Sequence, residues 1–161
     1  MVEMTFGKKA GDIRASHQMP RCGIATGSTV LTLAGALPVE YIAPGDRVIT
    51  RAGARTVRSV QISVVKNCDV ISISEGVLDR DRPDEDICVA PTQPIMIRDW
   101  RAKALSGVAQ AVVAASKLVD GEYVRRVTAS EIWMISLHFD ATEVIYANGL
   151  ELTCEPAEVM A

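Results

Sequence analysis

Hydrophobic residues along this chain occur in short runs separated by glycine, proline, asparagine and aspartate. Several runs alternate apolar and polar positions, which is typical of strands with one buried face, and the turn residues between them indicate hairpins. We therefore predict a mostly β fold. The expected strands are Ser28–Leu33, Leu37–Ile42, Arg47–Thr50, Thr56–Lys66, Val70–Ser74, Ile87–Ala90, Ile95–Arg98, Glu122–Val127, Glu131–Phe139, Glu143–Ala147 and Leu150–Cys154.

Two local signals refine this pattern. Asn148-Gly149 separates the last two runs, and this dipeptide favours a two-residue type I′ turn, which requires positive φ at both positions. Ala109–Leu118 is rich in alanine and is followed by Asp120-Gly121, so it is predicted to form a helix. We expect at most this one short helix.

Composition supports a single folded domain. The chain has 161 residues, of which 48% are hydrophobic and 23% charged, enough to bury a core without disulfide support. The 19 valines and 13 isoleucines outnumber the 9 leucines, and branching at Cβ favours strands over helices. A net charge of −3 argues against a nucleic-acid-binding protein.

The ends of the chain lack a strong hydrophobic pattern. Residues 1–22 are expected to be a flexible leader, 23–155 the domain and 156–161 a tail. Lys8 and Lys9 are not followed by an apolar run, so no secretory signal peptide is predicted, and no run is long enough to span a membrane. A cytoplasmic location is the default expectation, and export without such a signal stays open.

Four cysteines, at positions 22, 68, 88 and 154, form no CxxC pair, and the only histidines are His17 and His138. The sequence therefore predicts no zinc site and no cofactor. A disulfide between two of these cysteines is an alternative, although a chain of this length does not require one. The acidic segment 75–86 lacks the regular ligand spacing of an EF-hand calcium loop, and a solvated loop is the preferred interpretation.

Four ordered blocks resemble the bacterial members of the Hint (Hedgehog/intein) family. The first block contains a "G-S-T-V-L-T" strand and then "P-V-E-Y-I-A-P-G-D-R-V-I-T". The blocks cover nearly the whole domain: 27–50, 89–100, 115–127 and 136–150. This resemblance implies a flattened, pseudo-twofold β fold that brings the two ends of the domain together.

The resemblance also implies a self-cleaving chemistry. In the family, a cysteine or serine at the first domain position attacks the preceding peptide carbonyl, and the resulting thioester or ester is then resolved. Here Gly23 occupies the expected position, four residues before Gly27, and glycine has no nucleophile. Cys22 lies one residue too early. We keep it as a candidate nucleophile, because a one-residue bulge re-aims side chains.

The two histidines of the family pattern are also replaced. One position falls on Gln93, whose amide donates hydrogen bonds but cannot act as a general acid, and the other falls on Thr142. We predict that Gly23, Gln93 and Thr142 lie around one vestigial site. The expected function is a structural or binding module, with a protein partner as yet unspecified, that has lost autoprocessing. The alternatives are an active self-processing domain that uses Cys22 and an unrelated β-rich scaffold.

Other candidate residues receive plain structural interpretations. His138 lies four residues before Thr142, too far along a strand to replace its histidine, and is expected to bond a neighbouring carbonyl. Trp100 is expected to pack under an arginine at a structural corner, with an interaction surface as the alternative. The three remaining cysteines are expected to be small buried hydrophobes: Cys68, Cys88 and Cys154.

Overall fold

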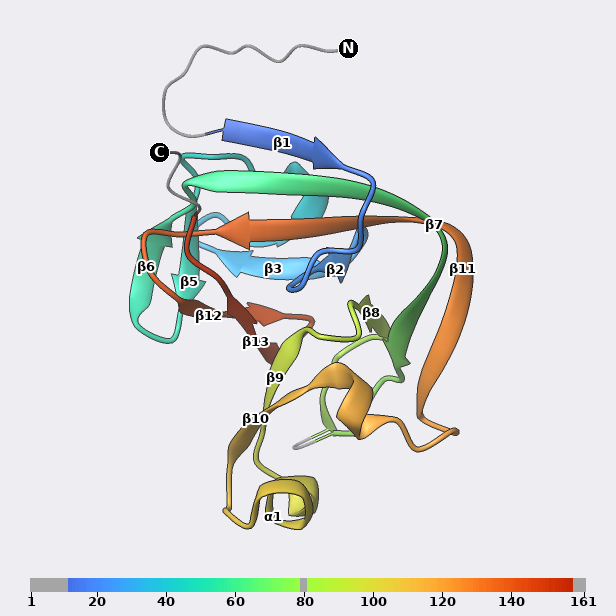
Figure 1. Ribbon diagram of the computed structural model, residues 1–161. Coiled ribbons are helices and arrows are strands. Elements are labelled where there is room, and N and C mark those ends of the chain that lie inside the picture. Colours follow the sequence, from blue (N-terminus) through green and yellow to red (C-terminus); the bar gives the residue numbers. More distant parts are fainter. Residues whose placement is uncertain (1–11, 79–80, 158–161) are drawn as a thin grey trace.

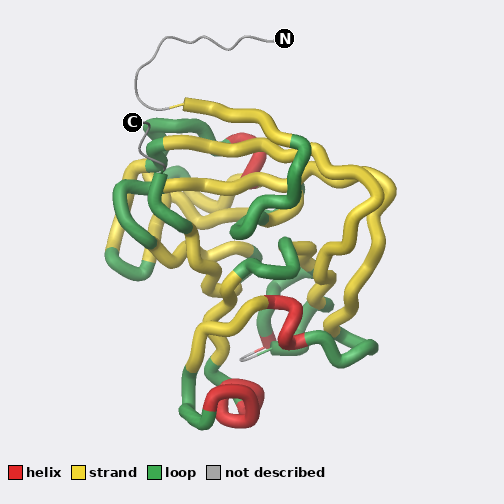
Figure 2. The backbone as a smooth tube through the Cα atoms, in the orientation of Figure 1, coloured by secondary structure: helices red, strands yellow, loops and turns green. Residues whose placement is uncertain are grey.

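The computed structural model of the protein describes residues 12–78 and 81–157. These residues form a mostly β fold with one α-helix, as predicted (Figures 1 and 2). The strands are β1 Asp12–Ser16, β2 Ile24–Ala25, β3 Thr29–Thr32, β4 Gly35–Pro38, β5 Arg47–Thr50, β6 Gly53–Thr56, β7 Ser59–Ile73, β8 Ile87–Val89, β9 Pro94–Ile97, β10 Ala111–Ala114, β11 Val124–His138, β12 Glu143–Ala147 and β13 Leu150–Cys154. The helices are α1 Trp100–Ser106 and the 3-10 turns η1 Val39–Tyr41 and η3 Ala115–Leu118.

The described strands form two sheets. The first has the order β1-β7-β11-β2-β8, and the second has the order β10-β9-β13-β12-β3-β5-β6 with β4 paired to β3. The long strands β7 and β11 are antiparallel partners from Ser59↔His138 to Ile73↔Val124 and curve together along one side of the molecule (Figure 1). Residues far apart in sequence therefore share a large buried core, which includes Phe139, Ile71 and Ile95.

The expectation of an unstructured leader is wrong for residues 12–16. They form β1, which pairs in parallel with β7 from Asp12↔Ser59 to Ser16↔Ser63 (Figure 1). Ile13 and Ala15 are exposed, so this edge strand depends on backbone hydrogen bonds to β7 rather than on a buried face. A hydrophobic pattern cannot reveal such a strand. Residues 1–11 and 158–161, which belong to the predicted leader and tail, lie outside the described residues.

The prediction of a helix at 109–118 is also wrong. The segment forms β10, whose Val112 and Val113 pair with Met96 and Ile95 of β9, and then the short turn η3. The α-helix lies earlier, at 100–106. It is capped by Asp99, whose side chain accepts from the backbone N–H of Arg101, and it ends at Gly107 in the left-handed conformation. The strand preference of Val112 and Val113 outweighs the helix preference of the alanines around them.

The hairpin prediction is confirmed. β12 and β13 have the predicted bounds and pair from Glu143↔Cys154 to Ala147↔Leu150. Asn148 has φ 49° and Gly149 has φ 84°, as a type I′ turn requires. The hairpin ends bring Cys154 and Glu155 back toward the start of the domain. None of the helices in the described residues is long and apolar enough to cross a membrane.

Candidate functional site

The candidate site lies where the chain enters β2. Ile24 is buried and pairs with Ile135 of β11 on one side and with Val89 of β8 on the other. The carbonyl of Gly23 accepts a hydrogen bond from the backbone N–H of Ala90 at 3.0 Å. These backbone contacts hold the Cys22-Gly23 junction between the two strands and the segment that leads to β9.

A small cavity of about 10 Å³ lies beside this junction. Its lining includes Gly23 and Gln93, which are far apart in sequence, together with Cys22 and Cys154. Thr142 is exposed just before β12 and is absent from this lining. The structure thus brings Gly23 and Gln93 to one cavity, whereas Thr142 lies outside its lining.

Gln93 acts as a buried hydrogen-bond donor between two segments. Its side chain is 2% exposed, and its Nε2 donates to the carbonyls of Pro94 and Thr153, both at 2.9 Å. The amide thus joins the start of β9 to the end of β13. Both donor hydrogens are used by backbone carbonyls, and an amide releases no proton near neutral pH.

Gly23 is closely packed. A Cβ placed on it would lie 2.6 Å from Cγ of Pro20, although its φ lies outside the left-handed region. Any side chain at this position, including that of a cysteine, must displace the buried proline ring. Position 23 therefore has no free space for a side chain while Pro20 keeps its place.

We expect Gly23→Ala to lower the free energy of unfolding by about 1–3 kcal/mol, the usual cost of overpacking. Pro20→Ala removes the Cγ atom that clashes, so the double variant should recover most of that loss. Urea unfolding of the wild type, both single variants and the double variant gives the coupling energy. Strictly additive losses would show that the proline is not the obstacle.

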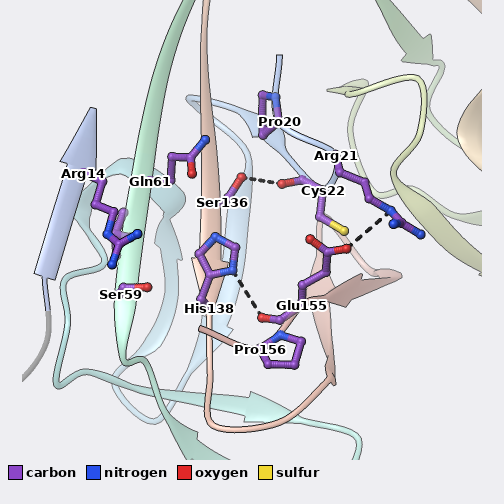
Figure 3. Close-up of a pocket in the computed structure, with 11 residues that line it drawn as sticks. Arg14, Pro20, Arg21, Cys22, Ser59, Gln61, Ser136, His138, Glu155 and Pro156 are labelled. Atoms are coloured by element: carbon purple, nitrogen blue, oxygen red, sulfur yellow. Dashed lines mark hydrogen bonds and ion pairs between the residues drawn. The ribbon is translucent and has the colours of Figure 1, made fainter. Parts of the chain in front are cut away.

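Cys22 faces a second, larger cavity of about 140 Å³, which contains His138 and Glu155 (Figure 3). His138 projects from β11, and its Nδ1 lies 3.2 Å from the carbonyl oxygen of Glu155, in line with the expectation that it bonds a carbonyl. The carboxylate of Glu155 pairs with Nε of Arg21 at 3.3 Å. That His138 shares a cavity with Cys22 could not be predicted from its distance to Thr142 along one strand.

The Cys22 thiol is poorly suited to nucleophilic attack. It is 5% exposed, and its pKa is raised to about 11, chiefly by burial and then by the charge of Glu155, with an opposing effect of Arg21. With this pKa only about one thiol in 10⁴ is ionised at pH 7. The thiolate is the reactive form of cysteine, so its scarcity slows any attack.

The peptide bond that precedes Cys22 has one feature suited to cleavage. The carbonyl oxygen of Arg21 accepts a hydrogen bond of 2.7 Å from the hydroxyl of Thr92. The next carbonyl, that of Cys22, accepts from the hydroxyl of Ser136 (Figure 3). A donor on the Arg21 oxygen would stabilise negative charge that forms there during attack. Thr92 and Ser136 were not singled out from the sequence, since an isolated hydroxyl carries no spacing signal.

The raised pKa of Cys22 gives a pH-dependent prediction. Because the folded thiol ionises near pH 11, its alkylation by iodoacetamide should accelerate about tenfold per pH unit between pH 7 and 10. In urea the same thiol should approach its maximal rate near pH 9. Peptide mass mapping of Cys22 measures both profiles. Superimposed profiles would contradict a buried thiol.

The other cysteines and Trp100 differ in how far they are buried. Cys154 is buried, as expected for all three, whereas Cys68 and Cys88 are only partly buried. The Arg101 guanidinium lies 4.8 Å from the Trp100 ring centre, yet Trp100 is 69% exposed. Within residues 12–78 and 81–157, no three acidic, histidine or cysteine side chains gather as a metal-binding group.

Comparisons with known proteins agree with the fold. A family model described as "Hint domain" matches residues 22–155. The solution structure of a bacterial intein-like domain from Clostridium thermocellum matches with a TM-score of 0.57 at 18% identity, over 83% of this chain and 98% of that one.

Two intein crystal structures are similar in fold. A variant of the gp41-1 intein has a TM-score of 0.53 and 14% identity, over 83% of this chain and 98% of the intein. The MchDnaB-1 intein has a TM-score of 0.52 and 12% identity, over 82% and 99%. No curated protein sequence matches the chain. At these identities the similarity establishes the fold alone.

Proposed function

Because this chain belongs to the Hint family, we propose that it is a Hint domain that keeps the family fold as a structural or protein-binding module and leaves the Arg21–Cys22 peptide bond intact. The observation that carries the proposal is the placement of Gln93. Its buried amide joins the carbonyls of Pro94 and Thr153, at the position where the family resemblance calls for a histidine.

Self-cleavage requires a nucleophile and a proton donor for the departing nitrogen. Gly23 supplies no nucleophile, and its packing against Pro20 leaves no room for one. Cys22 supplies a thiol whose raised pKa keeps it protonated at neutral pH. Gln93 supplies no acid. The loss of general acid catalysis alone slows a reaction by about 10²–10⁴-fold.

The segment before Cys22 also has a structural role. β1 is part of the first sheet through its pairing with β7, and Arg21 is tied to Glu155 and, through its carbonyl, to Thr92. A segment that is released by cleavage has no need to form a strand of the domain. The contacts of β1 are therefore those of a retained part of the fold.

The second candidate function is slow cleavage between Arg21 and Cys22. The hydrogen bond from Thr92 to the Arg21 carbonyl favours it, because that donor sits where negative charge would form. His138 shares the cavity with Cys22 and is the side chain there that would pass a proton to the departing nitrogen. Under this alternative, cleavage depends on both Cys22 and His138.

The intact mass of the freshly purified chain separates the two candidates. The retained-module proposal predicts one species that still carries residues 1–21. A species that begins at Cys22, found in the wild type and missing from Cys22→Ala, would establish the slow-cleavage alternative. His138→Gln provides the matched control, since under the alternative it should also abolish that species.

A further inference from the structure

The cavity beside Gly23 brings together two thiols from opposite ends of the domain. Cys22 precedes β2, and Cys154 is the last residue of β13. Both side chains are buried, and both line a space of about 10 Å³, which is about the size of a single water probe. The two thiols thus reach the same small space in the core.

The flanking residues hold these two backbone segments together. Arg21 and Glu155 form an ion pair at 3.3 Å, so the residue before one cysteine contacts the residue after the other. Thr153, on the other side of Cys154, is joined to Gln93. Burial and then the charge of Cys22 raise the pKa of Cys154, which is an electrostatic sign of their proximity.

We propose that Cys22 and Cys154 are an oxidisable pair that hydrogen peroxide, or another small hydroperoxide, converts into a disulfide. Cys22 also lines the larger cavity of about 140 Å³, which has room for a peroxide molecule, so Cys22 is the thiol that is oxidised first. Cys154 lines only the inner cavity among those described and acts as the resolving thiol.

The reaction balances with peroxide as the oxidant. The Cys22 thiolate attacks one peroxide oxygen; an S–O bond forms, the O–O bond breaks, and the leaving hydroxide takes up a proton to become water. The sulfur of Cys154 then attacks the sulfenic sulfur of Cys22. The S–S bond forms, the S–O bond breaks, and the second water carries away the Cys154 proton. Two electrons pass from the sulfurs to the peroxide.

Such a bond would join the start of the domain to its last strand. It would close nearly the whole chain into one loop and would also remove Cys22 as a nucleophile. The inference is independent of the proposed function, because it requires only that the two thiols meet. Cys68 and Cys88 are not expected to form this disulfide, because they lie on β7 and β8 outside both cavities.

The test uses the reduced, full-length protein under native conditions at pH 9, where more Cys22 is ionised. After exposure to hydrogen peroxide, unreacted thiols are alkylated in denaturant and the protein is mapped without reduction. We expect the mass before alkylation to be lower by about 2 Da, the two hydrogens that a disulfide removes, and the map to show a peptide pair linking Cys22 to Cys154. A disulfide between other cysteines, or a sulfinic acid at Cys22 without that link, would overturn the proposal.

Matched variants make the test sharper. Cys88→Ser should leave the linked peptide pair unchanged. Cys154→Ser should trap Cys22 as a sulfenic acid that reacts with dimedone and then proceeds to the sulfinic acid. If dimedone labels Cys22 to the same extent in the wild type and in Cys154→Ser, Cys154 does not resolve the oxidised thiol and the proposal is wrong.

Discussion

Asn148→Ala is expected to lower the free energy of unfolding by about 3–5 kcal/mol, the combined cost of lost buried hydrogen bonds and a strained backbone. The Asn148 Oδ1 accepts from both the backbone N–H and the hydroxyl of Thr29, at 2.8 and 3.1 Å. Its Nδ2 donates to the carbonyls of Glu85 and Asp86. One side chain in a hairpin turn thus joins β3 and the segment that precedes β8.

Asn67 offers a matched control for this prediction. It has the same φ of 49° as Asn148 but is exposed. Asn67→Ala should therefore cost only about 1 kcal/mol, the price of the left-handed conformation. Urea unfolding of the two variants measures the difference. Equal losses would mean that the buried contacts of Asn148 do not stabilise the fold.

Gln93→Glu is expected to destabilise the protein by about 3–5 kcal/mol at pH 8, since it buries a charge without a partner. The substitution keeps the shape of the side chain but turns a donor into a carboxylate that faces the carbonyl oxygens of Pro94 and Thr153. Gln18→Glu makes the same charge change at an exposed position and should leave stability nearly unchanged.

The loss in Gln93→Glu should depend on pH with a definite sign. Burial raises the folded-state pKa of the new carboxyl above its unfolded value of about 4.3. Below that unfolded pKa both states are protonated and the deficit is small. The deficit then grows by about 1.4 kcal/mol per pH unit until the folded-state pKa is reached. Urea unfolding at pH 4 and pH 8 tests this, and a deficit that shrinks with rising pH would contradict the buried contact.

The sequence was most informative where structure is local. The strands flanking Asn148-Gly149 could be predicted to the residue because the turn and the alternating pattern agree. β1 could not be predicted, because an exposed edge strand leaves no periodic signal. α1 begins after the cap Asp99 and ends before Gly107, in a segment for which no helix was predicted.

The site was only partly predictable for the same reason. Gly23 and Gln93 were found by matching blocks of sequence, and they do line one cavity. The meeting of Cys22 with His138, Glu155 and Cys154 arises from pairing between distant strands, which no spacing along the chain reveals. Thr142 is exposed and does not contribute to the lining of that cavity.

The most direct measurement of the central claim is the mass of the chain after prolonged incubation with hydroxylamine at neutral pH. Hydroxylamine cleaves any thioester, so even a slow acyl shift at Cys22 accumulates as a fragment that ends at Arg21. The account predicts that neither the wild type nor Cys22→Ala releases a fragment that ends at Arg21 in this assay. A fragment that ends at Arg21, present in the wild type and absent in Cys22→Ala, would contradict it.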